Sequence, residues 1–122
     1  MIGTIKVGYN WTVAEIDHEL GRYLRRLFLR TFGIKLQRPS NKEHITIISE
    51  YEKLYDKLPL EKYHKKQVNF KLVLQAYTNG NAFWCPVLSM EIGEIRESTG
   101  LCYEPEYGFH FCIGYLNNGI IE

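Results

Sequence analysis

Two stretches of this chain repeat one pattern of apolar and polar positions. Residues 44–49 and 109–116 each contain a histidine, followed by apolar residues that alternate with small or polar ones. Alternation with a period of two predicts a half-buried β-strand, in which side chains two apart share a face. Four side chains are therefore expected on the open faces of these strands: His44, Thr46, His110 and Cys112. Four apolar side chains between them are expected to point into the core: Ile45, Ile47, Phe111 and Ile113.

A long amphipathic helix is predicted over residues 13–32. Apolar residues recur there three and four positions apart: Ile16, Leu20, Tyr23, Leu24, Leu27 and Phe28. Thr12 and Glu15 have the spacing of a capping box at its start, and Gly33 is placed for a left-handed cap at its end. The other helix face carries four arginines: Arg22, Arg25, Arg26 and Arg30. A basic stripe could follow a phosphate backbone, but we interpret it as a solvated face, because exposed charges usually signify little.

The remaining patterns predict further strands and short helices. Strands are expected over four ranges: residues 4–9, 34–36, 69–77 and 82–92. The Asn79-Gly80 turn makes residues 69–92 a hairpin, and Pro86 favours an edge position or a bulge. Short helices are expected over residues 51–58, ended by Pro59, and over 93–99, capped by Gly100; residues 61–67 and 103–108 are expected to be connections. Together these elements predict an α+β domain.

Composition narrows the class of protein. The chain has 122 residues, of which 45% are hydrophobic, so residues 1–122 are expected to form a single domain with its own core. Its 15 basic and 14 acidic residues are balanced, so no overall field indicates a nucleic-acid or membrane partner. The three cysteines lack a CxxC spacing, which favours a reduced setting and argues against structural zinc. No apolar run approaches the roughly 20 residues of a membrane helix, and the start lacks signal-peptide features, so we expect a cytoplasmic protein.

The paired histidines are the strongest indication of a functional site. A lone histidine on a strand is usually structural, but here two of the four histidines open nearly identical strand patterns. We expect no catalytic role for the other two, because His18 falls on the helix and His64 in a charged connection.

His44-Ile45-Thr46-Ile47 and the stretch from His110 to Tyr115 resemble the paired H-x-(T/S)-x motifs of the 2H phosphoesterases. That family includes LigT-like RNA ligases and cyclic phosphodiesterases, viral 2′,5′-phosphodiesterases, and phage phosphodiesterases that destroy cyclic-oligonucleotide signals. The resemblance implies a two-lobed α+β fold, with pseudo-symmetric antiparallel sheets around a central cleft, one long helix and one or two short ones. It also implies a phosphodiesterase acting on a small nucleotide or an RNA end, and the small size of the chain resembles a minimal viral or phage version.

The residue types fit this chemistry. Cleavage of a phosphodiester needs a base for the attacking oxygen and an acid for the leaving oxygen, and histidine can serve as either near neutral pH. His44 and His110 would take these roles, in an order that the sequence leaves open. Thr46 and Cys112 would donate hydrogen bonds to the non-bridging oxygens. The nucleophile would be a 2′-hydroxyl of the substrate or water, and neither a metal nor another cofactor is expected.

Cys112 departs from the family pattern, which has Thr or Ser at this position. A thiol is a weaker donor than a hydroxyl, so the position could be a tolerated variant, a sign of a different substrate, or a mark of a decayed enzyme. A thiol nucleophile is a fourth interpretation, which would require a lowered pKa. We favour the tolerated variant, because cysteine is close to serine in size and His110 is intact.

Aromatic residues near the motifs are candidates for stacking on a base, since stacking tolerates any base. Tyr9 and Trp11 follow the first predicted strand, and Tyr107 precedes the second motif.

Three other classes of function stay open. A non-catalytic module could bind nucleotides or RNA ends with the same fold, which the cysteine at 112 would suit. A metal-dependent hydrolase fits less well, because no acidic residue accompanies either motif at ligand spacing and Glu43 points away from His44. A plain interaction domain would need neither histidine. The linkage cleaved, the base preference and the oligomeric state are not predicted.

Overall fold

One antiparallel sheet of eight strands organises the computed structural model, which describes residues 1–52 and 56–122. The strands are β1 (Ile2–Val7), β2 (Thr12–Glu15), β3 (His44–Ile48), β4 (Gln67–Asn69), β5 (Lys71–Leu72), β6 (Tyr77–Thr78), β7 (Ala82–Leu88) and β8 (Phe109–Tyr115). Their order in space is β4-β1-β2-β3-β8-β7-β5, with β6 also paired to β7. The predicted α+β class is confirmed, but the sheet is continuous, because β3 pairs with β8 at its centre.

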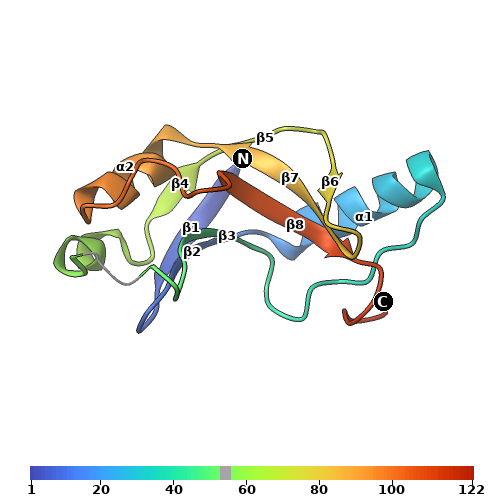
Figure 1. Cartoon of the computed structure of the whole chain (residues 1–122), viewed down its shortest axis with the longest axis horizontal. Coiled ribbons are helices and arrows are strands. Elements are labelled where there is room, and N and C mark those ends of the chain that lie inside the picture. The colour runs from blue at the N-terminus through green and yellow to red at the C-terminus, as the bar shows by residue number, and fades with distance from the viewer. Residues whose placement is uncertain (53–55) are drawn as a thin grey trace.

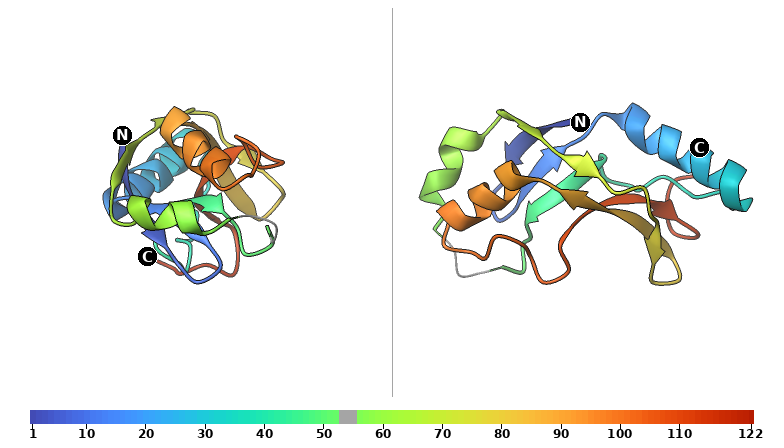
Figure 2. Two further views of the ribbon diagram at one scale, coloured as in Figure 1. Left: turned by 90° about the vertical axis from the view of Figure 1, so that its left-hand side faces the viewer. Right: turned by 90° about the horizontal axis from the view of Figure 1, so that it is seen from above.

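Outside the sheet, the described part of the chain forms two α-helices and one 3₁₀-helix. They are α1 (His18–Phe32), α2 (Met90–Ser98) and the 3₁₀-helix η1 (Leu58–Tyr63). The two α-helices lie at opposite ends of the long axis of the molecule (Figure 1), and the view from above keeps them apart (Figure 2). Among the described residues, we find no helix with the length and apolar character needed to cross a membrane.

The core lies between one face of the sheet and these helices. Leu24 and Phe28 of α1, together with Ile92 and Ile95 of α2, belong to the same buried cluster as the central strands. The residues predicted to point inward are all buried, which confirms the alternation: Ile45, Ile47, Phe111 and Ile113. The opposite faces of β3 and β8 carry the histidines.

The start of the long helix was predicted wrongly. Thr12 to Glu15 form β2, which pairs with β1 on one side and β3 on the other, and the helix begins at His18. Asp17 is the N-cap, and its carboxylate accepts a hydrogen bond from the Glu19 N–H at 2.9 Å. Pairing on both edges satisfies the backbone groups of residues 12–15 in strand form, which outweighs the capping-box spacing. The predicted end is confirmed, because Gly33 has a φ of 70°.

Several shorter elements also differ from the prediction. Residues 34–36 form no strand, and the chain that follows makes only isolated bridges, from Gln37 to Tyr115 at the end of β8 and from Arg38 to Ile120. The strand expected over 69–77 is divided among β4, β5 and β6, with Leu74 and Ala76 exposed. The hairpin turn is confirmed, with Gly80 at a φ of 105°.

The second half of the predicted hairpin is shorter than expected. β7 ends at Leu88, because the Ser89 hydroxyl accepts a hydrogen bond from the Ile92 N–H and starts α2 three residues early. Pro86 does not lie on an edge strand, since β7 runs between β8 and β5; the register shift in β7 lies earlier, between Phe83 and Trp84.

The helix predicted over 51–58 lies partly outside the described residues, which omit 53–55. Pro59 does not end a helix but occupies the first turn of η1, where its missing N–H costs nothing. η1 continues to Tyr63, so the connection expected over 61–67 begins as a helical turn. Residues 103–108 form the predicted loop before β8.

Candidate active site

The two histidine strands lie side by side at the centre of the sheet. β3 and β8 are antiparallel, with Ile45 opposite Phe111 in the core. This register sets His44 across from Cys112, and Thr46 across from His110, on the open face. The two histidines are therefore diagonal neighbours, a relation that places Cα atoms roughly 7–8 Å apart in a regular sheet. The structure thus brings together all four residues of the predicted motifs.

Each imidazole is oriented by a carbonyl two residues before it. Nδ1 of His44 lies 2.6 Å from the oxygen of Lys42, and Nδ1 of His110 lies 3.5 Å from the oxygen of Gly108. A carbonyl can only accept, so Nδ1 carries the proton and donates in both contacts. Nε2 is then the atom of each ring left to exchange a proton with a bound molecule.

Two buried arginines hold the far ends of the histidine strands. Arg25 of α1 donates from Nη1 to the Ile113 carbonyl at 3.1 Å, and Arg96 of α2 donates from Nη1 to the Ile47 carbonyl at 2.8 Å. Each carbonyl lies three residues after a histidine, so the two halves repeat one contact. Both side chains are nearly inaccessible, at 4% and 3% exposed.

The prediction that Arg25 lies on the solvated face of the helix is therefore wrong. Gly21 and Phe28, four residues before it and three after it, are both buried. That spacing puts Arg25 on the buried stripe of the helix, and this signal could have identified it from the sequence.

A cavity of about 520 Å³ opens beside His44 and Thr46. It is bordered by β1, β2, β3 and the segment that follows β3, and its lining consists of Lys6, Trp11, Val13, Glu15, Asn41, Lys42, His44, Thr46, Ser49, Glu50 and Tyr51. His110 and Cys112 lie outside this lining, so the cavity belongs to the His44 side of the pair.

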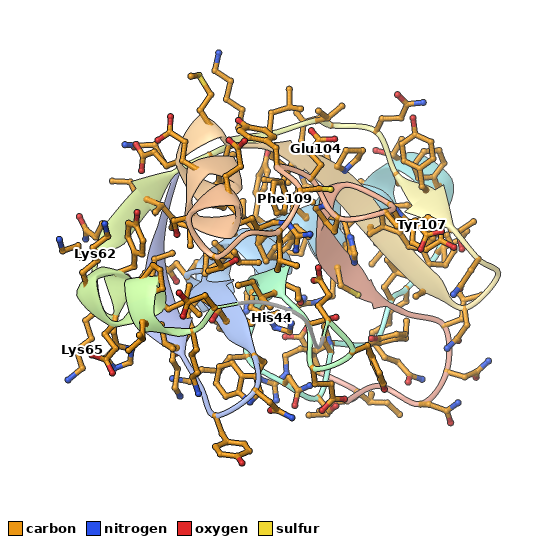
Figure 3. The ribbon with its side chains drawn as sticks, turned by 60° about the vertical axis from the view of Figure 1, so that its left-hand side comes forward. His44, Lys62, Lys65, Glu104, Tyr107 and Phe109 are labelled. Atoms are coloured by element: carbon orange, nitrogen blue, oxygen red, sulfur yellow. The ribbon has the colours of Figure 1, made fainter. Side chains whose placement is uncertain are left out.

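Of the three predicted stacking residues, only Trp11 lines the cavity. Tyr9 is 89% exposed, and the Lys57 ammonium lies 5.2 Å from its ring centre. Tyr107 is 87% exposed on the loop before β8, well separated from His44 in Figure 3.

Sequence reasoning missed four side chains around the histidines. Lys6 and Lys42 both pair with Glu15, at 3.7 Å and 3.3 Å, on the wall of the cavity. Tyr51 forms part of the same wall. On the other side, the Trp84 ring centre lies 6.2 Å from that of His110. The alternation of β1 and β7 could have put Lys6 and Trp84 on an open face, but only the strand pairing shows which face.

Cys112 is a half-buried thiol rather than an activated one. Burial raises the pKa of Cys112, which outweighs the lowering effects of hydrogen bonds from the Tyr115 side chain and the Gly114 backbone and of the Arg25 charge. Its sulfur lies 3.9 Å from the Gly114 oxygen. A raised pKa argues against the thiol-nucleophile interpretation, because the thiolate is the reactive form.

The other two histidines make structural contacts. Nδ1 of His18 lies 3.3 Å from the buried carboxylate of Glu43. Nδ1 of His64 accepts a hydrogen bond from the Val7 N–H at 3.1 Å.

Within residues 1–52 and 56–122, no group of three or more His, Cys, Asp or Glu side chains is arranged to hold a metal ion. Comparison of the chain with protein-family models, with curated proteins and with solved structures gives no match.

Proposed function

We propose that this chain is a 2H-type phosphodiesterase that hydrolyses a nucleotide or RNA-end phosphoester. The observation that carries the proposal is the pair of diagonal histidines, each donating its Nδ1 proton to a backbone carbonyl and presenting Nε2 on the open face of the sheet. Candidate substrates are a 2′,3′-cyclic phosphate, a 2′-5′ linkage or a cyclic oligonucleotide.

The proposed reaction needs only these side chains. Nε2 of one neutral histidine takes the proton of the attacking hydroxyl or water as the new P–O bond forms. Nε2 of the other histidine, in its protonated form, gives a proton to the leaving oxygen as the old P–O bond breaks. Thr46 and Cys112, each across from one histidine, donate to the non-bridging oxygens. Neither a metal nor another cofactor has a part in this scheme.

The surroundings of the pair support a substrate with a base. Trp11 and Tyr51 supply aromatic surface in the cavity beside His44, and Lys6 and Lys42 supply positive charge. Trp84, beside His110, supplies a second aromatic surface. We propose that one nucleoside enters the cavity and that the scissile phosphate lies between the histidines.

The finer form of the fold is part of the same proposal. The repeated contacts of the two halves support a two-lobed, pseudo-symmetric arrangement: a carbonyl before each histidine, and a helix arginine on the carbonyl three residues after it. A small nucleotide or an RNA end would be encountered in the cytoplasm, including a host cytoplasm for a viral or phage protein.

The second candidate function is a module that binds nucleotides or RNA ends without turnover. The thiol of Cys112 favours this function, because it would stabilise the negative charge on the phosphate oxygens less than a hydroxyl would.

The test uses the purified protein with EDTA and a panel of 2′,3′-cyclic nucleotides, 2′-5′ oligoadenylate and cyclic oligonucleotides. His44→Ala and His110→Ala are compared with His64→Ala, a matched control outside the site. Turnover of one substrate class that is lost in both site variants, and kept in the control, would support the enzyme. Nucleotide binding without any turnover would instead favour the binding module.

A further inference from the structure

A second cavity, of about 320 Å³, lies along α1 rather than on the histidine face. Four cationic side chains line it: Arg22, Arg25, Arg26 and Lys35. Glu122 is the one acidic residue of this lining, and Leu29 and Leu36 complete it. Positive charge is therefore in excess here, although it is balanced over the whole chain.

Arg25 lines this cavity, and its guanidinium is already bound to groups inside the protein. It donates to the Ile113 carbonyl at 3.1 Å, and to Glu43, which is itself buried, at 3.4 Å. Glu43 therefore balances the charge of Arg25 inside the protein. Its third nitrogen, Nε, donates to Glu122, which also lines the cavity, at 2.6 Å.

Glu122 thus occupies the position of an anionic ligand. Its side chain is 31% exposed, whereas that of Glu43 is 4% exposed. The hydrogen bond from Arg25 lowers the pKa of Glu122, and the charges of Arg25, Arg22 and His18 add to this effect. Together they outweigh burial, which raises the pKa, so the carboxylate is ionised near neutral pH.

We propose that this cavity binds a phosphoryl group in exchange for the Glu122 carboxylate. Carboxylate and phosphate oxygens accept from a guanidinium in the same geometry, and a phosphate carries the larger charge. Arg25 provides the fixed donor, while Arg22, Arg26 and Lys35 provide charge at the rim. Leu29, which is 43% exposed, offers apolar surface for the group that carries the phosphate. This site is separate from the paired histidines and does not depend on their proposed activity.

The test is calorimetric titration with inorganic phosphate at low ionic strength. The parent protein is the His44→Ala/His110→Ala double variant, so that the histidine face does not contribute to binding. Glu122→Gln is expected to bind phosphate about tenfold more tightly than the parent, because a competing charge-assisted hydrogen bond is lost. Arg22→Gln/Arg26→Gln is expected to bind at least about tenfold more weakly. Arg30→Gln, on the same helix but outside the lining, is the matched control and should bind like the parent.

A second titration distinguishes the sources of the phosphate. Single-stranded oligonucleotides with and without a 5′-phosphate are compared in the same four proteins. A preference for the phosphorylated strand that Arg22→Gln/Arg26→Gln removes would identify a strand end as the ligand. Binding of inorganic phosphate without that preference would identify a small phosphate compound.

Equal phosphate binding in the parent, Glu122→Gln and Arg22→Gln/Arg26→Gln, or none in any of them, would overturn the proposal. Thermal unfolding of each variant checks that it is folded.

Discussion

Cys112 is the residue at which the two histidine motifs differ most, and its environment is that of an inert thiol. Burial raises the pKa of both Cys112 and Cys85, whereas Cys102 is exposed. If the proposed chemistry holds, Cys112 acts as a neutral donor across from His44, at the position where the motif of the 2H phosphoesterases has a hydroxyl.

The first prediction concerns the order in which the cysteines react. At pH 8, iodoacetamide should modify Cys102 first and Cys112 at least several-fold more slowly, because a raised pKa leaves less thiolate and burial limits access. Raising the pH should accelerate modification of Cys112. Peptide mass spectrometry over time gives each rate, and Cys102→Ser removes the fast reaction as a control. Fast modification of Cys112 at pH 7 would contradict the raised pKa and restore the thiol nucleophile as an interpretation.

Thr12 shows how a local sequence signal can mislead. Its spacing from Glu15 is that of a helix cap, yet the residue is completely buried in β2. Its hydroxyl has no hydrogen-bond partner among the described residues. Burying a hydroxyl without a hydrogen-bond partner is unfavourable, so the Thr12 hydroxyl lowers the free energy of unfolding.

The second prediction follows from this hydroxyl. Thr12→Val keeps the shape of the side chain and should raise the free energy of unfolding by about 1 kcal/mol, measured by urea denaturation. The matched control is Thr99→Val, because the buried Thr99 hydroxyl donates to the Arg96 carbonyl at 2.6 Å. That control should lose about 1 kcal/mol. A loss of stability in Thr12→Val would show that the hydroxyl has a partner.

At the scale of elements, the sequence predicted correctly those strands and helices that depend mainly on neighbouring residues. The histidine strands follow from alternation, and the body and C-cap of α1 follow from helical spacing and Gly33. The misplaced elements depend on partners distant in sequence. Residues 12–15 are a strand because β1 and β3 lie on either side of them, and residues 69–77 are divided because β4 and β5 pair with different strands.

The turn between β1 and β2 positions the one predicted aromatic that reaches the cavity. The Trp11 ring lies against Gly8, where a Cβ atom would come within 2.3 Å of the ring. The ammonium of Lys6, on β1, lies 6.0 Å from the centre of the same ring. Glycine at this position therefore leaves the space that the indole fills.

The third prediction tests this contact through substrate binding. Gly8→Ala should displace the Trp11 ring and raise KM for the substrate identified in the activity test. The expected loss of binding free energy is roughly 1–3 kcal/mol, the contribution of one base stacked on an aromatic side chain. The effect on kcat should be smaller, since neither Gly8 nor Trp11 is one of the proposed acid, base or hydrogen-bond donors. The double variant Gly8→Ala/Trp11→Ala should have the same KM as Trp11→Ala alone, because both substitutions remove the same stacking contact. Additive losses would mean that Gly8 acts independently of Trp11.

At the scale of the whole molecule, the candidate site was only partly predictable. The motifs identified His44, Thr46, His110 and Cys112, because strand alternation alone puts each pair on one face. The cavity could not be predicted in the same way, because Lys6, Trp11 and Tyr51 come from separate segments that meet only after β1, β2 and β3 pair.

The two buried arginines connect the helices to the histidine strands across the molecule. Arg96 holds three separate parts at once: the Ile47 carbonyl of β3, the Cys102 carbonyl after α2, and the Glu52 carboxylate at 2.8 Å. Burial raises the pKa of Glu52, but hydrogen bonds from Arg96 and from the Ser49 N–H, with the Arg96 charge, outweigh it and leave the pKa below its usual value of 4.5.

The last prediction is that acid weakens the fold at this contact. A carboxylate with a lowered folded-state pKa stabilises the protein above its unfolded pKa, and this contribution is lost as pH falls through the folded-state value, here below 4.5. Protonation of Glu52 also leaves Arg96 buried without its charged partner, which is strongly unfavourable.

The test is Glu52→Gln, which should lower the free energy of unfolding at pH 7 by about 1–3 kcal/mol in urea denaturation. The difference from the natural chain should shrink as the pH approaches about 3. Glu97→Gln, an exposed position on α2, is the matched control and should change little at either pH. An unchanged pH dependence in Glu52→Gln would mean that other carboxylates govern acid unfolding, and that the Arg96 contact holds β3 to α2 through its carbonyl bonds alone.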